Sequence, residues 1–479
     1  MKARVVFVAL LLSGCTVGPD FRAPDPPATD GYVRGAAPKL TIASRDIPAE
    51  WWKVFESQEI DALVQKALAS SPTLEVAQAR VRQAKALREA REGGTWPRAD
   101  LAAGAERQRI DPATFGFPQA PNPGPFNVFS LGVNASYDFD IFGGSRRELE
   151  ALAAEIDYQA YELEGARLTI ASNVVATAIR QAALGAQIEV TEAILAAQRQ
   201  ELAIAEKRYE LGGVALVAVR NQGVLVAQTE ASLPPLRAQQ ARASHYLAVL
   251  TGEPPATADV PAIALDRLKL PGGVPLRLPS ELVRQRPDIL ASEALLHKAS
   301  ANVGVATADL YPKLVVSGSF SSSQLAIGDV LGNGINIWNI GLNLLQPLFR
   351  GGELQARKRA AEAAYEQALG AYRQTVLGGL QDVADVLRAL EADVLAVSAR
   401  SLQAERAEEA YRITLERFRA GGVSELTLIE ADRQRLAARV AHLDARAGQY
   451  ADAAALFQAL GGGWGKDVAS NEAPSAAKH

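Results

Sequence analysis

One proline-free stretch, bounded by glycine pairs, decides the fold of this chain of 479 residues. Residues 145–211 read SRRELEALAAEIDYQAYELEGARLTIASNVVATAIRQAALGAQIEVTEAILAAQRQELAIAEKRYEL. As one α-helix, this stretch would be about 100 Å long at ~1.5 Å per residue, which exceeds what a globular core requires. Residues 353–420 form a second stretch of the same kind. The two stretches together predict an extended helical bundle or tube.

The apolar residues of the first stretch predict how its helix packs. They recur every seven positions, at Leu149, Ile156, Leu163 and Ile170, and the series then steps by four to Val174. A step of four locally unwinds a left-handed supercoil. Together with the many alanines, this step favours helices packed on both sides, as in the wall of a cylinder. The alternative is a plain two-stranded coiled coil.

Each long helix is expected to end at a glycine pair and to be followed by a shorter return helix. The pairs are Gly212-Gly213 and Gly421-Gly422, and glycine tolerates the positive φ of a helix C-cap. The return helices are predicted over residues 214–250 and 423–460. Pro234-Pro235 lies inside the first of them and should kink or interrupt it, because proline cannot donate a backbone hydrogen bond.

Two pairs of alternating stretches predict four β-strands, at about residues 99–110, 128–139, 313–322 and 336–345. In the second of these, Phe129, Leu131 and Val133 share one face, whereas Ser130 and Gly132 share the other. The lengths suit strands that cross a membrane. Because the smallest such barrels need about eight strands, one chain cannot close a barrel. Either the sheet is soluble or several chains contribute to one barrel.

The order of these elements occurs twice, which indicates an internal duplication. Pro72 and Pro97 are matched by Pro287 and Pro312 at the same spacing. We divide the chain into an N-terminal segment, a first repeat, a proline-rich equatorial connector, a second repeat and a C-terminal tail, at residues 15–50, 51–252, 253–285, 286–463 and 464–479.

Residues 1–14 are expected to be a secretory signal peptide. Two positive charges precede a short apolar run, and the sequence Leu12-Ser13-Gly14-Cys15 resembles the lipobox of bacterial lipoproteins. The resemblance implies cleavage before Cys15 and a covalent lipid on its thiol. No aspartate follows Cys15, which in lipoproteins generally implies export to the outer membrane. The alternative is an ordinary signal peptide with an incidental cysteine.

The composition argues against most chemistry. The formal net charge of −4 offers no basic excess for nucleic acid, and one cysteine excludes a disulfide within the chain and a cysteine-cluster metal site. The four histidines belong to no catalytic or metal-binding motif, and the single methionine is the initiator. The composition therefore offers no candidate catalytic residue and no candidate metal ligands, and we expect no cofactor apart from the lipid.

Several short motifs, taken in order, resemble the TolC-like outer-membrane efflux proteins, and among them the lipoprotein branch of NodT and OprM type. These motifs cover residues 15–21, 51–55, 286–289, 310–312, 348–352 and 459–464. The resemblance implies a mainly α fold with a transmembrane β part. Three chains would form a twelve-stranded outer-membrane barrel, continuous with a long periplasmic α-helical barrel and a mixed equatorial domain.

The resemblance also implies the function and the partners. The homotrimer would be anchored in outer-membrane lipid and extend into the periplasm. There it would dock on a periplasmic adaptor (membrane fusion) protein that links it to an inner-membrane RND-type transporter. It would be a passive exit duct for drugs or other small toxic compounds. Three alternatives stay open: an outer channel for type I protein secretion, metal-ion efflux, and a structural lipoprotein without a pore.

The family's pattern places a periplasmic gate on the second return helix. Leu426 would supply an apolar plug and Glu430 a charged ring, with Arg419 and Arg433 as candidate partners. The family usually has Asp in place of Glu430, and Gln where this chain has Asp432. The equivalent site in the first repeat is Asn221, beside Arg220. The alternative is that Glu430 is an ordinary solvated helix position.

The tips of the two hairpins are the expected contact with the adaptor. The residues assigned to this contact are Arg208, Tyr209, Gly212, Gly213, Arg417, Phe418, Gly421 and Gly422. An equally good interpretation is that Tyr209 and Phe418 only pack the end of each hairpin.

Overall fold

The computed structural model describes residues 16–29, 31–34, 42–44, 47–271, 273–275, 279–332 and 335–464. The chain divides into two compact units. The first consists of Arg80–Gln159, Ser292–Tyr372 and the described part of Met1–Pro24, and the remaining residues form the second. Four helices contribute residues to both units: α3 (Pro72–Gly93), α4 (Gly144–Glu210), α7 (Pro287–Ala308) and α8 (Glu353–Arg419).

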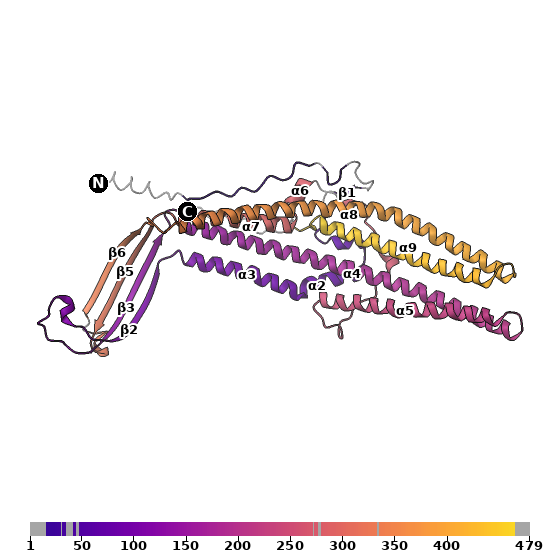
Figure 1. The fold of residues 1–479 in the computed structure, drawn as a ribbon, viewed down its shortest axis with the longest axis horizontal. Helices are drawn as coiled ribbons and strands as arrows, with labels where there is room; N and C mark the ends of the chain where they lie inside the picture. Colours follow the sequence, from indigo (N-terminus) through magenta and orange to yellow (C-terminus); the bar gives the residue numbers. More distant parts are fainter. Residues whose placement is uncertain are drawn as a thin grey trace. The chain divides into compact units, whose positions relative to one another are not determined.

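The first unit contains a four-stranded antiparallel sheet of order β2-β3-β5-β6 (Figure 1). The strands are β2 (Arg98–Gln108), β3 (Phe126–Phe139), β5 (Lys313–Gln324) and β6 (Ile335–Leu345). Short 3-10 turns η2 (Pro112–Phe115) and η4 (Ile327–Asp329) lie in the loops that join each pair. Each repeat supplies one hairpin, and β3 pairs with β5 to join them.

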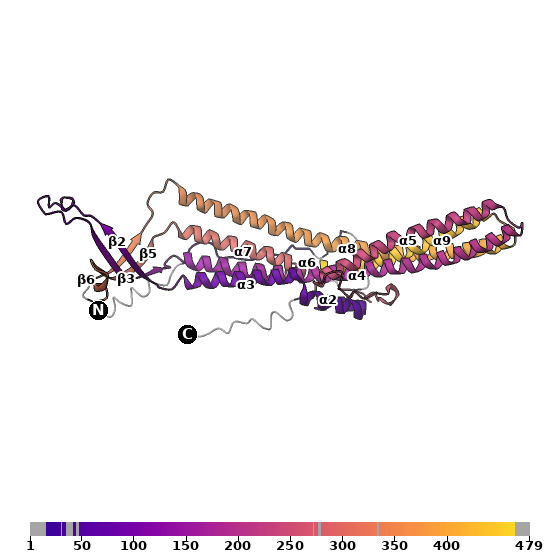
Figure 2. The same cartoon turned by 90° about the horizontal axis from the view of Figure 1, so that it is seen from below.

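The second unit contains the ends of two helical hairpins (Figures 1 and 2). The return helices are α5 (Leu216–Leu250) and α9 (Glu425–Ala459), and each begins two residues later than its sequence pattern indicates. Gly212 and Gly421 both have a φ of 73°. The next amide in each turn donates to a carbonyl of the preceding helix, from Gly213 to Arg208 at 2.7 Å and from Gly422 to Arg417 at 2.8 Å. These bonds satisfy carbonyls at the helix end, so the glycine pairs terminate the helices as expected.

Of the two effects expected of Pro234-Pro235, a kink or an interruption of the first return helix, the interruption is wrong. Helix α5 runs without a break through Pro234 and Pro235. The residue before them, Leu233, is buried against Leu195 of α4 and Val226 of α5. This packing along the hairpin offsets the hydrogen bonds that the two prolines cannot donate.

The hydrophobic core of the second unit lies where the two repeats meet the connector. Trp51 of η1 (Trp51–Phe55) stacks on Phe457 of α9 with ring centroids 5.3 Å apart. Tyr450 donates its hydroxyl to the carbonyl of Leu268 in the connector at 2.6 Å. The smaller elements of this unit are α2 (Gln58–Ser70), η3 (Leu265–Arg267), α6 (Pro279–Val283) and the parallel pair of β1 (Ile42–Ser44) with β4 (Val274–Pro275).

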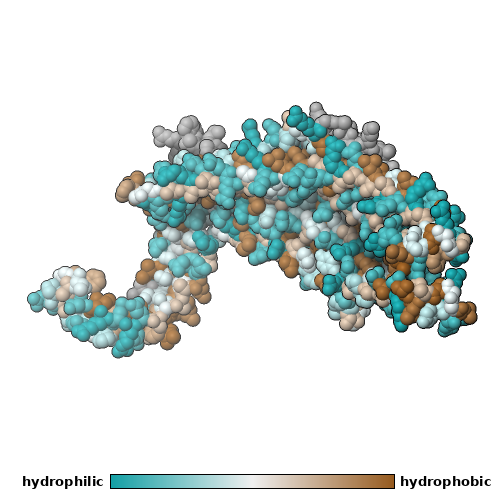
Figure 3. All heavy atoms as spheres, turned by 45° about the vertical axis from the view of Figure 1, so that its right-hand side comes forward, coloured by the Kyte–Doolittle hydropathy of each residue, from teal (hydrophilic) through white to brown (hydrophobic). Residues whose placement is uncertain are grey.

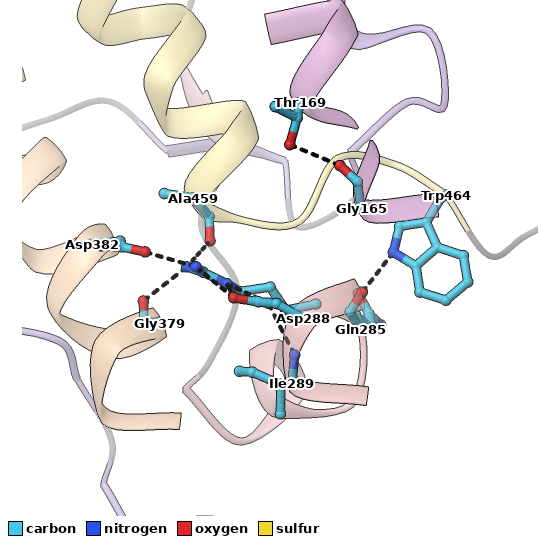
Figure 4. A network of polar contacts seen from close by, with 10 residues as sticks. Gly165, Thr169, Gln285, Asp288, Ile289, Gly379, Asp382, Ala459 and Trp464 are labelled. Carbon is cyan, nitrogen blue, oxygen red and sulfur yellow. Dashed lines mark hydrogen bonds and ion pairs between the residues drawn. The ribbon is translucent and has the colours of Figure 1, made fainter. Parts of the chain in front are cut away.

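One arginine ties three helices of the second unit together (Figure 4). Arg286 precedes α7 and pairs with Asp288 at 2.9 Å and with Asp382 of α8 at 2.6 Å. It also donates to the carbonyls of Gly379 in α8 and Ala459 at the end of α9. Burial favours the neutral form of Arg286, but the hydrogen bonds and charges of Asp288 and Asp382 outweigh it and raise the pKa of Arg286. The motif at residues 286–289 therefore has a structural role, since its arginine connects α7, α8 and α9.

Candidate channel site

The sheet has one apolar and one polar face, and both are open. Leu101, Val133, Phe320 and Trp338 lie in register as one row across all four strands. Each of them is between 44% and 72% exposed. A soluble sheet would bury such a row, because a large exposed apolar patch marks a site of interaction. Figure 3 shows apolar residues at the surface of the strands.

The next row on the opposite face is polar. It contains Asp100, Asn134, Ser319 and Asn339, again in register across the four strands. The Asn339 amide donates to the Ser319 hydroxyl at 2.9 Å. Alternation of an apolar and a polar row is the pattern of a membrane strand that has lipid on one side and water on the other. Within the described residues, β2 and β6 each pair with a single strand, so both edges of the sheet are open.

No described helix combines the length and the apolar content that crossing a membrane would require.

The hairpin tips present charged and aromatic side chains. Arg208, Tyr209 and Arg417 are exposed, whereas Phe418 is half-buried. Phe418 lines a cavity of about 290 Å³ between the hairpins, together with Ile204 of α4 and Leu428 of α9. Tyr209 is therefore the more accessible of the two aromatic residues, and Phe418 packs in the groove between the hairpins.

The two proposed gate residues share one face of α9. Leu426 is 69% exposed, and Glu430 follows it four residues later on the same side of the helix. Arg433 pairs with Glu430 at 2.9 Å, and Gln434 donates to the same carboxylate at 3.0 Å. The hydrogen bonds from Arg433 and then Gln434 lower the pKa of Glu430. Glu430 is thus an ionised, solvent-facing carboxylate beside an apolar side chain.

Two of the expected gate residues do not lie with Glu430. Asp432 is 1% exposed and faces the interior of the bundle, because two residues turn an α-helix by about 200°. It pairs with Arg435 at 2.5 Å and accepts a hydrogen bond from Gln198 of α4. Arg419 pairs with Glu416 at 2.9 Å, one turn earlier in α8. The charge partner of Glu430 within the chain is therefore Arg433.

A buried polar network near the tip was not predicted from the sequence. Arg435 lies over the ring of Tyr411 at 3.8 Å, and the Tyr411 hydroxyl donates to Glu201 of α4 at 2.7 Å. Burial, followed by the hydrogen bond to Glu201, raises the pKa of Tyr411. A signal was present, since Leu428, Asp432 and Arg435 follow the three-and-four spacing of one helix face. The network joins the second hairpin to the first.

Cys15 lies outside the described residues. Within the part of the chain that the structure describes, no cluster of three or more His, Cys, Asp or Glu could hold a metal ion.

Comparison with known proteins places these features in context. A family model described as outer membrane efflux protein matches residues 63–253 and 278–462. The pyoverdine export outer membrane protein OpmQ of Pseudomonas aeruginosa is 31% identical over 468 residues, which cover 97% of each chain. The cation efflux system protein CusC of Escherichia coli K12 is 27% identical over 466 residues, covering 95% of this chain and 98% of CusC. The solved structure of the outer-membrane channel OprN has a TM-score of 0.85 and 28% identity, covering 94% of this chain and 100% of that chain.

Proposed function

The chain belongs to the outer membrane efflux protein family and is an outer-membrane efflux channel that extends into the periplasm, and we propose that three copies form the conducting unit. Channels of this family are trimers that work with adaptor proteins and inner-membrane pumps, and they are not enzymes. The partners of this chain would be one adaptor and one RND-type transporter, which supplies the energy.

The open-edged amphipathic sheet is the observation that carries this proposal. Four strands cannot close a barrel, since about eight are the minimum. Three copies would join edge to edge, β2 of one to β6 of the next, and give twelve strands. The row containing Trp338 would then face lipid, and the row containing Asn339 would face the water-filled lumen. A lipid on Cys15 would add a further anchor to the outer membrane.

The periplasmic gate would be formed by the exposed face of α9. Three copies of Leu426 would close the passage by apolar contact, and three copies of Glu430 would form a charged ring beside it. Arg433 offsets the repulsion among these carboxylates, because each guanidinium lies within 2.9 Å of its own Glu430. The exposed residues near Tyr209 would meet the adaptor.

Single-channel conductance tests the gate. A Leu426→Ala, Glu430→Ala variant should conduct more than the unaltered channel, because it lacks both the plug and the ring. The matched control is Val217→Ala, Asn221→Ala at the equivalent positions of the first hairpin, where Val217 is 63% exposed. Unchanged conductance in the first variant would remove the gate from these positions.

The transported compounds are tested in cells. A strain that lacks this channel should accumulate small toxic compounds and become more susceptible to them, and the chain expressed in trans should restore export. A strain with unchanged susceptibility and a defect in the secretion of one protein would support the type I secretion alternative.

A further inference from the structure

We propose that residues 16–21 are a docking segment, and that Arg147, Gly304 and His297 form its receptor at the sheet end of α4 and α7. The inference rests on the proposed function in one respect: the residue bonded to this segment, Cys15, is the expected lipid carrier. The motif at residues 15–21 otherwise has no assigned role. Receptor and docking segment all belong to the first unit.

Arg147 is the centre of the receptor. It is 4% exposed, although it carries a charge, and its donors point at the docking segment. Its Nε donates to the carbonyl of Val17 at 3.1 Å, and one Nη donates to the Asp20 carboxylate at 2.8 Å. The other Nη donates to Glu150 at 2.8 Å, one turn along α4. A buried guanidinium that donates to a backbone carbonyl and to a carboxylate of the same short peptide holds that peptide in one position.

Two glycines make this approach possible. Gly18 has a φ of +95°, and a Cβ built on it would collide with the Cα of Gly304 in α7. A Cβ on Gly304 would in turn lie 2.7 Å from Cγ of Arg147. The docking segment, α7 and the arginine stem therefore meet at a point that admits no side chain. The glycine inside α7, which weakens a helix, is explained by this crossing.

An aromatic contact completes the receptor. Phe21 stacks on the imidazole of His297, with ring centroids 4.4 Å apart and an angle of 13° between the planes. The Nε2 atom of His297 lies 3.0 Å from Glu150, the carboxylate that also pairs with Arg147. One acidic residue thus orients both the arginine and the histidine that hold the segment.

The docked segment leads to the base of the strands. The amide of Val17 donates to the carbonyl of Phe142 at 3.1 Å, in the link between β3 and α4. Thr16 packs closely against Gly143. A Cβ atom added to Gly143 would lie 2.8 Å from the methyl carbon of Thr16. Cys15 is bonded to Thr16, so a lipid on Cys15 is attached at most one residue from this link. Because the segment is docked, the lipid would be held at a fixed position at the sheet end of the unit. An undocked segment would leave the lipid free to move relative to the sheet.

A spin label at Arg22→Cys tests the docking in the purified full-length channel. Arg22 is exposed and follows Phe21 directly, and a lipidated Cys15 does not react with the label. In Arg147→Ala, rotational mobility of the label should rise roughly threefold, because the segment loses its receptor. The control Arg146→Ala removes the neighbouring arginine, which is exposed and pairs with Asp140, and should leave the mobility unchanged.

Gly18→Ala provides a second variant in case Arg147→Ala does not fold. It alters only the docking segment, so the helices and strands should form, and the label should again become mobile. Unchanged mobility in either folded variant would overturn the proposal. Mass spectrometry of Cys15 and bilayer conductance of the same samples test the lipid and the channel separately, so a failure of the proposed function is distinguished from a failure of the docking.

Discussion

The two helical hairpins have helices of the same length and different interiors. Gly144 and Glu353 begin the long helices, Leu216 and Glu425 begin the return helices, and each pair is 209 residues apart. Both long helices have 67 residues and both return helices have 35. The same turn hydrogen bonds recur at the same offset. Duplication has therefore preserved length and turn geometry along the whole hairpin.

The interiors diverge at equivalent positions. Leu202 and Val226 belong to an apolar cluster in the first hairpin, whereas their counterparts Tyr411 and Arg435 form the polar network with Asp432. That network also bonds to Gln198 and Glu201 of the first hairpin. Helix length and the glycine pair determine the shape of a hairpin. The buried side chains determine which neighbour it joins.

The strongest test of this comparison removes the acid of the network. Asp432→Ala should lower the free energy of unfolding by about 3 kcal/mol, because buried Arg435 then keeps only the more distant Glu408 of α8, at 3.7 Å, as an acidic partner. Chemical denaturation of the detergent-solubilised channel, followed by circular dichroism, measures the loss. The control Glu430→Ala removes an exposed acid of the same helix and should change the value by less than ~0.5 kcal/mol. Equal effects of the two variants would contradict the buried network.

A second test converts the polar interior into an apolar one. In the variant Gln198→Leu, Tyr411→Leu, Asp432→Ala, Arg435→Val, we expect stability between that of the unaltered chain and ~2 kcal/mol above it, since replacing a buried ion pair by packed apolar residues is often neutral or stabilising. The same denaturation assay applies. A loss as large as that of Asp432→Ala alone would show that the hairpins need the polar bonds for their stability.

A third test concerns a carboxyl pair found only in the second hairpin. Burial, and then the neighbouring Asp452, raise the pKa of Asp393 from 3.8 to about 6. Between about pH 4 and pH 6, Asp393 is therefore protonated in the folded state and ionised in the unfolded state. Stability is greatest below the ordinary pKa and falls as the pH rises through 6. Because both residues are only half-buried, the expected change is about 1 kcal/mol.

Thermal unfolding from pH 4 to pH 8 measures this change. Asp393→Asn should flatten the profile in that range, and Asp385→Asn, at an exposed position of α8, should leave it unchanged. A profile that Asp393→Asn does not alter would exclude the pair as its cause.

The smallest test exchanges the helix caps. The Ser424 side chain caps α9 by accepting a hydrogen bond from the backbone amide of Thr427. Ala215, at the equivalent position of α5, provides no such bond. Ser424→Ala should cost about 1 kcal/mol and Ala215→Ser should gain ~0.5 kcal/mol. The denaturation midpoints of the two variants measure these two changes in the free energy of unfolding. A gain from Ala215→Ser larger than the loss from Ser424→Ala would break the equivalence of the two turns.

The elements with a strong local signal were predictable from the sequence. The four strands lie within two residues of their expected ends, because their alternation has a period of two that no other element shares. The glycine pairs locate the turns because positive φ is a local requirement. The exposed pair of Leu426 and Glu430 also follows from spacing along one helix.

The sequence by itself determined the duplication, the lengths of the helices, the glycine turns and the amphipathic strands, since each depends on residues close together in the chain. Only the tertiary structure decided that Asp432 faces inward, that α5 passes through Pro234 and Pro235, and that residues 16–21 lie against Arg147. These outcomes depend on partners more than a hundred residues away or on a neighbouring helix. Burial and packing energies between distant segments outweigh the local preferences that a sequence pattern records.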